Sequence, residues 1–231
     1  MELCIFNKIE DDLCIKGILE KDNVIVLRNI IEFSETEGVT SSAIKEYVAT
    51  RLANDDNILS RLAQAGKFIG DDLYRLAKFD IEQIYRKLFS TQIKYAPSGN
   101  PIGFSNGYVA SIRAITESKS AQELLDLLIE HYRKFGSGIL AKYNAFRYDG
   151  ELIGVSNTDD ITFDSLVGIE YQKQVLIDNT KAFVSGKAAN NVLLFGDRGT
   201  GKSSSVKALL NMFCDDGLRI IEMPKHCIKD I

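Results

Sequence analysis

The pattern Gly-x-x-x-x-Gly-Lys-Ser over residues 196–203 constrains the fold of this 231-residue chain more than any other feature. A continuous apolar run at 192–195 precedes it, which is typical of a parallel strand buried on both faces. Apolar residues at helical spacing follow it, from Val206 to Phe213. A glycine-rich loop between a strand and a helix is suited to cradling phosphate groups. The sequence therefore predicts an α/β unit that binds a nucleoside triphosphate, and we expect ATP with Mg²⁺.

A triphosphate requires many hydrogen-bond donors and a positive charge, and this motif supplies both. Its glycines allow backbone conformations closed to other residues, so that amide groups can approach phosphate oxygens at the N-terminus of the following helix. Lys202 should reach the β- and γ-phosphates, and the hydroxyl of Ser203 should ligate Mg²⁺. The residues predicted to contact the nucleotide in this motif are Gly196, Gly199, Thr200, Gly201, Lys202, Ser203 and Ser204.

The first two thirds of the chain have mostly helical apolar spacing. Ser120 and Glu123 form a capping box at the start of one strong helical pattern. Aromatic and aliphatic residues around Asp149-Gly150 predict a hairpin within 139–155. The segment 95–107, rich in proline and glycine, is expected to be a linker. We therefore expect a helical N-terminal domain at 1–155.

Beyond residue 156 the pattern changes. A helical pattern covers 169–184, and a second apolar run at 218–223 follows the helix after the loop. Strand, helix and strand would form a right-handed βαβ unit. The expected fold class is a mostly α N-terminal domain plus an AAA+-like α/β P-loop NTPase part at 156–231, with an incomplete parallel sheet.

Composition and charge exclude several classes of protein. The net charge is −4, which gives no basic surface for nucleic acid. The N-terminus lacks the features of a signal peptide, and no apolar stretch is long enough to span a membrane. The four cysteines have no metal-ligand spacing and indicate reduced thiols in a cytoplasmic protein. We expect a nucleotide, and a protein partner or a homo-oligomer, as binding partners.

Several strings upstream of the loop, in it and after it point to one family. They are 163–170, 172–173, 179–180, 190–194, 199–204 and 207–210. Together they resemble an uncharacterised bacterial AAA+ ATP-binding family, a domain of unknown function, from about Ser156 to the C-terminus. The resemblance implies that Leu166, Val167, Gly168 and Ile169 flank the adenine. It also implies an ATPase that couples hydrolysis to protein remodelling in the complete protein.

The sequence departs from the pattern of an AAA+ motor. An apolar strand ending in acidic residues, a polar sensor and an arginine supplied by a neighbouring subunit are not recognisable. Asp215 and Asp216 end the helix that follows the loop, and we interpret them as a solvated turn. We expect a truncated chain without its own hydrolysis machinery, and we assign no catalytic residue.

Other candidates carry weaker signals. His131 is expected to be a surface or satisfied helix histidine, and Cys4 and Cys14 to be free thiols. His226-Cys227 could begin a metal or thiol site, but no partner spacing supports it. Two rival functions remain open: a non-hydrolysing interaction or scaffold module, and a GTP-using switch, for which a guanine-recognition motif is missing.

Overall fold

The computed structural model describes residues 1–38, 42–89, 104–156 and 158–230. The chain divides into two compact units, Met1–Lys142 and Tyr143–Ile231. This division lies N-terminal to the boundary expected near residue 155, because the hairpin belongs to the second unit. The sequence-predicted linker falls mostly outside the described residues, and its described end at Asn106 already begins a helix.

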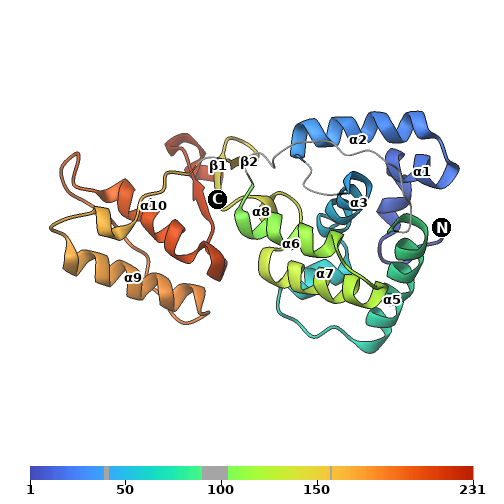
Figure 1. Ribbon diagram of the computed structural model, residues 1–231. Helices are drawn as coiled ribbons and strands as arrows, with labels where there is room; N and C mark the ends of the chain where they lie inside the picture. Colours follow the sequence, from blue (N-terminus) through green and yellow to red (C-terminus); the bar gives the residue numbers. More distant parts are fainter. Residues whose placement is uncertain (39–41, 90–103, 157, 231) are drawn as a thin grey trace. The chain divides into compact units, whose positions relative to one another are not determined.

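The N-terminal unit is built of helices (Figure 1). Its elements are η1 (Asn7–Asp11), α1 (Leu13–Glu20), α2 (Asn23–Glu37), α3 (Ala43–Ala53), α4 (Ile58–Gln64), α5 (Asp71–Ile84), the single π-helical turn η2 (Tyr85–Phe89), α6 (Asn106–Thr116), α7 (Ala121–Phe135) and α8 (Ile139–Lys142).

Local capping residues set several of these helix ends. Asn57 accepts from the backbone amide of Ser60 at 3.0 Å, and Ser60 Oγ accepts in return from the amide of Asn57 at 2.9 Å. Ser120 likewise accepts from the amide of Glu123, but the Glu123 carboxylate accepts from the amide of Lys119, so only half of the predicted capping box forms. Gly38 ends α2 with φ 75°, a conformation that L side chains rarely adopt. These ends follow from the sequence alone.

Helix α3 lies at the centre of the N-terminal unit and contacts α2, α6, α7 and η2. Nine of its eleven residues are buried, and Arg51 is the exposed one. The hydroxyl of Tyr132 on α7 donates to the carbonyl of Leu52 on α3 at 2.5 Å. This buried hydrogen bond satisfies two polar groups and fixes α7 against the central helix.

A buried carboxylate holds the N-terminal segment against α5. Asp80 is completely buried, and its oxygens accept from the backbone amides of Cys4, Ile5 and Phe6 at 2.6–3.1 Å. Three converging amide groups replace the water that this carboxylate gives up on burial. Asp80 therefore anchors residues 4–6 to α5.

His131 is buried rather than on the surface. It is 1% exposed, and its Nδ1 lies 2.8 Å from Ser111 Oγ. The rings of Tyr108, Tyr132 and Phe135 surround it at 5.4–6.0 Å between centroids. Its Nε2 has no hydrogen-bond partner among the described residues. Burial lowers the pKa of this imidazole to about 4.

The C-terminal unit has a small sheet and two long helices. Its elements are β1 (Ala145–Tyr148), β2 (Leu152–Val155), η3 (Phe163–Ser165), α9 (Glu170–Val184), α10 (Lys202–Phe213), η4 (Cys214–Asp216), β3 (Ile220–Glu222) and η5 (Lys225–Asp230). The hairpin around Asp149-Gly150 and the helix after the loop are confirmed. Asp215 and Asp216 lie exposed in the turn after α10, as expected.

The sheet is mixed, with the order β2-β1-β3. β1 pairs antiparallel with β2, and Arg147 lies opposite Ile153. β1 also pairs in parallel with β3, where Arg147 lies opposite Glu222 and binds it at 3.0 Å. The prediction of an incomplete parallel sheet was therefore wrong about which strands form it. The parallel partner of β3 is β1, a strand of the hairpin.

The apolar run at 192–195 forms no strand in the described structure. Its side chains remain exposed, with Val192 at 52%, Leu193 at 84% and Phe195 at 87%. A strand needs a neighbouring backbone to pair its amide and carbonyl groups, and no described strand pairs with this run. The segment that leads into the run is instead held by Asn179 on α9. The side-chain amide of Asn179 makes two hydrogen bonds with the backbone of Asn190, at 2.8–2.9 Å.

Gly154 on β2 makes room for the ring of Tyr143. A Cβ at Gly154 would lie 2.2 Å from Tyr143 Cδ2, far inside van der Waals contact. We expect Gly154→Ala to displace this ring and to destabilise the C-terminal unit by about 1–3 kcal/mol. Hydrogen exchange of the amides in 145–155 measures the effect, and Ile153→Ala, at a 46% exposed neighbouring position, is the control. Equal exchange in both variants would contradict this role of Gly154.

Among the described residues, no helix combines the length and apolar character needed to cross a membrane.

Candidate functional site

The glycine-rich loop has the backbone geometry that its sequence requires. Gly196, Gly199 and Gly201 have φ angles of 138°, 87° and 84°. Gly201 is also the N-cap of α10, in the left-handed conformation. An L side chain at this position would be strained, so glycine is needed here for the turn from loop to helix.

Lys202 folds back over the loop. Its Nζ donates to the carbonyl oxygens of Gly196 at 2.9 Å and Asp197 at 2.6 Å. It also lies 3.2 Å from Thr200 Oγ1, which in turn donates to the carbonyl of Asp197 at 2.9 Å. The structure therefore places the positive charge of the motif across the mouth of the loop, where it can meet an anion that enters the loop.

The N-terminus of α10 adds further donors beside this charge. The first amide groups of a helix have no partner within it, and Gly201 has no side chain that could accept from them. The first turn of α10 contains no acidic residue, and Ser203 is exposed in it. The helix dipole and Lys202 together make this end attractive to a negatively charged group. The residues present thus fit a phosphate.

The segment before α9 lies near the loop. A Cβ at Gly201 would lie 3.8 Å from both Leu166 Cδ2 and Ile169 Cδ1. Gly168 turns the chain with φ 81°, and Val167 is 90% exposed. The structure thus brings Leu166 and Ile169 to the loop, whereas the side chain of Val167 lies in solvent.

A hollow of about 550 Å³ lies between α10 and the sheet. Its polar lining includes Ser203 and the ion pair between Lys207 and Asp159. Asn211 holds this corner by donating to the carbonyls of Asp159 and Ile161 at 2.8–2.9 Å. Among the predicted contact residues, Ser203 alone lines the hollow. Most of the predicted loop therefore lies outside the hollow. The hollow reaches the loop at Ser203, the residue expected to ligate Mg²⁺.

The ion pair of Lys207 and Asp159 was not predicted from the sequence. The two residues are 48 positions apart, and neither belongs to the loop motif. Lys207 lies one helical turn after Ser203, so its nearness to the motif could have been predicted from helical spacing. Its partner could not, because 156–162 lies outside any regular pattern in the sequence.

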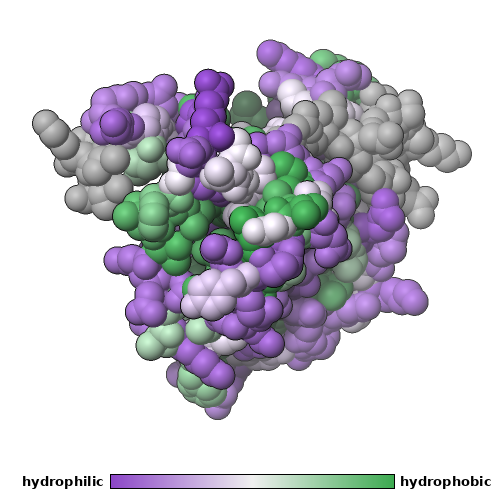
Figure 2. All heavy atoms as spheres, turned by 90° about the vertical axis from the view of Figure 1, so that its left-hand side faces the viewer, coloured by the Kyte–Doolittle hydropathy of each residue, from purple (hydrophilic) through white to green (hydrophobic). Residues whose placement is uncertain are grey.

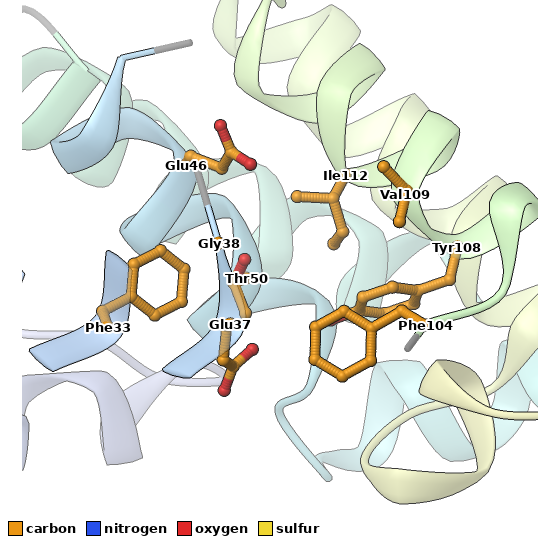
Figure 3. A pocket seen from close by; sticks show the side chains of 9 residues that line it. All are labelled: Phe33, Glu37, Gly38, Glu46, Thr50, Phe104, Tyr108, Val109 and Ile112. Atoms are coloured by element: carbon orange, nitrogen blue, oxygen red, sulfur yellow. The ribbon is translucent and has the colours of Figure 1, made fainter. Parts of the chain in front are cut away.

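The N-terminal unit has a further hollow, between α2, α3 and α6 (Figure 3). Phe33, Phe104 and Tyr108 line it together with the carboxyl groups of Glu37 and Glu46. Its volume is about 20 Å³, room for about one water molecule. This hollow is too small for a nucleotide.

Comparison with known proteins gives one match. The model of a family described as "Protein of unknown function (DUF815)" matches residues 141–231, which include the whole C-terminal unit. No curated protein and no solved structure matches the chain at a significant level.

Proposed function

We propose that the C-terminal unit binds ATP as its Mg²⁺ complex, in the manner of an AAA+-type P-loop NTPase. The observation that carries the proposal is the position of Lys202. Its ammonium group crosses the mouth of a loop with three glycines at positive φ, directly before an uncapped helix N-terminus. Charge, backbone donors and helix dipole converge there on one place for an anion.

Each predicted residue has a task in this proposal. Lys202 exchanges the carbonyl oxygens of Gly196 and Asp197 for phosphate oxygens, and the amides from Gly199 to Ser204 donate to the same phosphates. Ser203 supplies its hydroxyl to Mg²⁺. Leu166 and Ile169, which already lie beside Gly201, offer apolar surface to the base.

The test is calorimetry of ATP with Mg²⁺ on the full 231-residue chain. Lys202→Ala should weaken binding by about 10- to 100-fold, because one charge-assisted contact is worth about 1.5–3 kcal/mol. Lys187→Ala, which removes an exposed lysine of the same unit, should bind like the wild type. Equal affinity of the Lys202→Ala and wild-type chains would refute the proposed site. Equal competition by GTP would refute the preference for ATP.

A second candidate is an interaction or scaffold module without turnover. The exposed apolar side chains of the C-terminal unit favour it, above all Val167, Leu193 and Phe195, each at least 84% exposed. Figure 2 shows hydrophobic side chains gathered among hydrophilic ones on one face of the molecule. Large apolar patches commonly mark protein interfaces. In the leading proposal such a surface serves a protein partner or a second subunit, and nucleotide hydrolysis drives remodelling of that partner. Measurable ATP turnover by the chain excludes the module without turnover.

A further inference from the structure

Three potential metal ligands from distant parts of the sequence meet in the C-terminal unit. Asp149, His226 and Cys227 each offer one ligand atom, and these atoms all lie within 4.8 Å of one another. Among the residues that the structure describes, no other group of three such side chains comes this close. The site uses none of the loop residues and is independent of the nucleotide proposal.

The topology of the sheet produces this meeting. β1 and β3 are parallel neighbours, and Arg147 lies opposite Glu222 near their carboxyl ends. Asp149 follows β1 directly, and His226 and Cys227 lie in η5, a few residues after β3. The carboxyl ends of parallel strands share one edge of a sheet, which is where α/β sheets commonly bind ligands. The β1–β3 pairing thus brings the residues together despite their separation in sequence.

Local hydrogen bonds hold two of the ligands in place. The amide of Asp149 donates to the carbonyl of Glu151 at 3.0 Å, which closes the hairpin turn. The amide of Cys227 donates to the carbonyl of Pro224 at 3.0 Å, and the Cys227 side chain is buried at 5% exposure. Asp149 and His226 are exposed, so their side chains can rotate towards the buried sulfur.

We propose that Asp149, His226 and Cys227 bind one divalent transition-metal ion, with Zn²⁺ as the best fit. A carboxylate oxygen, an imidazole nitrogen and a thiolate are the three ligand types that zinc takes in proteins. Carboxylate and thiolate together neutralise the dication. Tetrahedral zinc bonds of about 2.0–2.3 Å place ligand atoms roughly 3.3–3.8 Å apart. Rotation of the Asp149 and His226 side chains needs to move their ligand atoms by only about an ångström to reach this spacing. Water would take the fourth coordination position.

The experiment titrates the reduced full-length chain with Zn²⁺, without nucleotide, and repeats the titration with Co²⁺ under visible spectroscopy. The wild type should bind one equivalent, and Co²⁺ should show thiolate charge-transfer absorption. Asp149→Ala, His226→Ala and Cys227→Ser should each weaken binding about 100-fold, and Cys227→Ser should lose the charge-transfer band. Cys214→Ser, which removes another free thiol of the same unit, should leave affinity and band unchanged.

Two results would overturn the proposal. One is a wild-type chain that takes up no stoichiometric Zn²⁺. The other is unchanged affinity in His226→Ala, a variant at an exposed position that should not disturb folding. Circular dichroism of each variant separates loss of a ligand from loss of the fold. The zinc titration contains no nucleotide, so its failure leaves the ATP proposal untouched.

Discussion

Asp80→Ala is expected to lower the free energy of unfolding of the N-terminal unit by about 3–5 kcal/mol. The side chain is completely buried and receives the amides of Cys4, Ile5 and Phe6. Alanine removes the acceptor from three donors, of which the Phe6 amide is buried and those of Cys4 and Ile5 are partly buried. Each buried amide that loses its partner costs about 1–3 kcal/mol.

Chemical denaturation of the full chain, followed by far-ultraviolet circular dichroism, measures this effect. Asp80→Asn keeps the shape and one carbonyl oxygen, so it should restore part of the loss. Glu82→Ala replaces an exposed acid on the same helix and should change stability by at most about 0.5 kcal/mol. If Asp80→Ala and Glu82→Ala unfold at the same denaturant concentration, the carboxylate does not anchor the N-terminal segment.

The second large effect is a loss of stability in acid that His131 causes. Its pKa in the folded chain is about 4, below the usual value of 6.5. Between these two values the unfolded chain binds a proton that the folded chain does not. The contribution of the neutral imidazole is therefore fully present above pH 6.5 and is lost as the pH falls towards 4. The expected loss is about 1.5 kcal/mol between pH 6.5 and 5, and about 3 kcal/mol by pH 4.

Replacing His131 by an aromatic residue that cannot be protonated tests this assignment. His131→Phe should flatten the pH dependence of unfolding between pH 6.5 and 5, because phenylalanine suits the surrounding rings and cannot be protonated. The comparison stays above pH 5 because carboxyl groups titrate below it. An unchanged slope in His131→Phe would assign the acid sensitivity to other groups.

Features that depend on neighbouring residues could be predicted from the sequence. Ser120 with Glu123, the Asp149-Gly150 turn and the helix that follows the loop all appear where their local chemistry requires them. Leu166 and Ile169 lie near Gly201, and the role beside the adenine that the family resemblance implies for them stays a prediction. The phosphate-binding role of the loop stays a prediction until binding is measured.

Features that depend on distant partners could not be predicted. The run at 192–195 has the composition of a buried strand, but composition does not name the backbone with which a strand would pair. The parallel pairing of β1 with β3, the amides around Asp80 and the group at Asp149 all join residues about 75 positions apart. No local pattern contains that information.

The place of β1 between its two partners also has a consequence for the timing of synthesis. The hairpin can close as soon as β2 is made, but Arg147 meets Glu222 only after another 75 residues. At about 5–20 residues per second, the ribosome leaves that edge of β1 without its partner for roughly 4–15 s. An unpaired strand edge invites pairing with other chains. During this interval, chaperones or rapid synthesis of the remaining residues must keep the exposed edge of β1 from pairing with other chains.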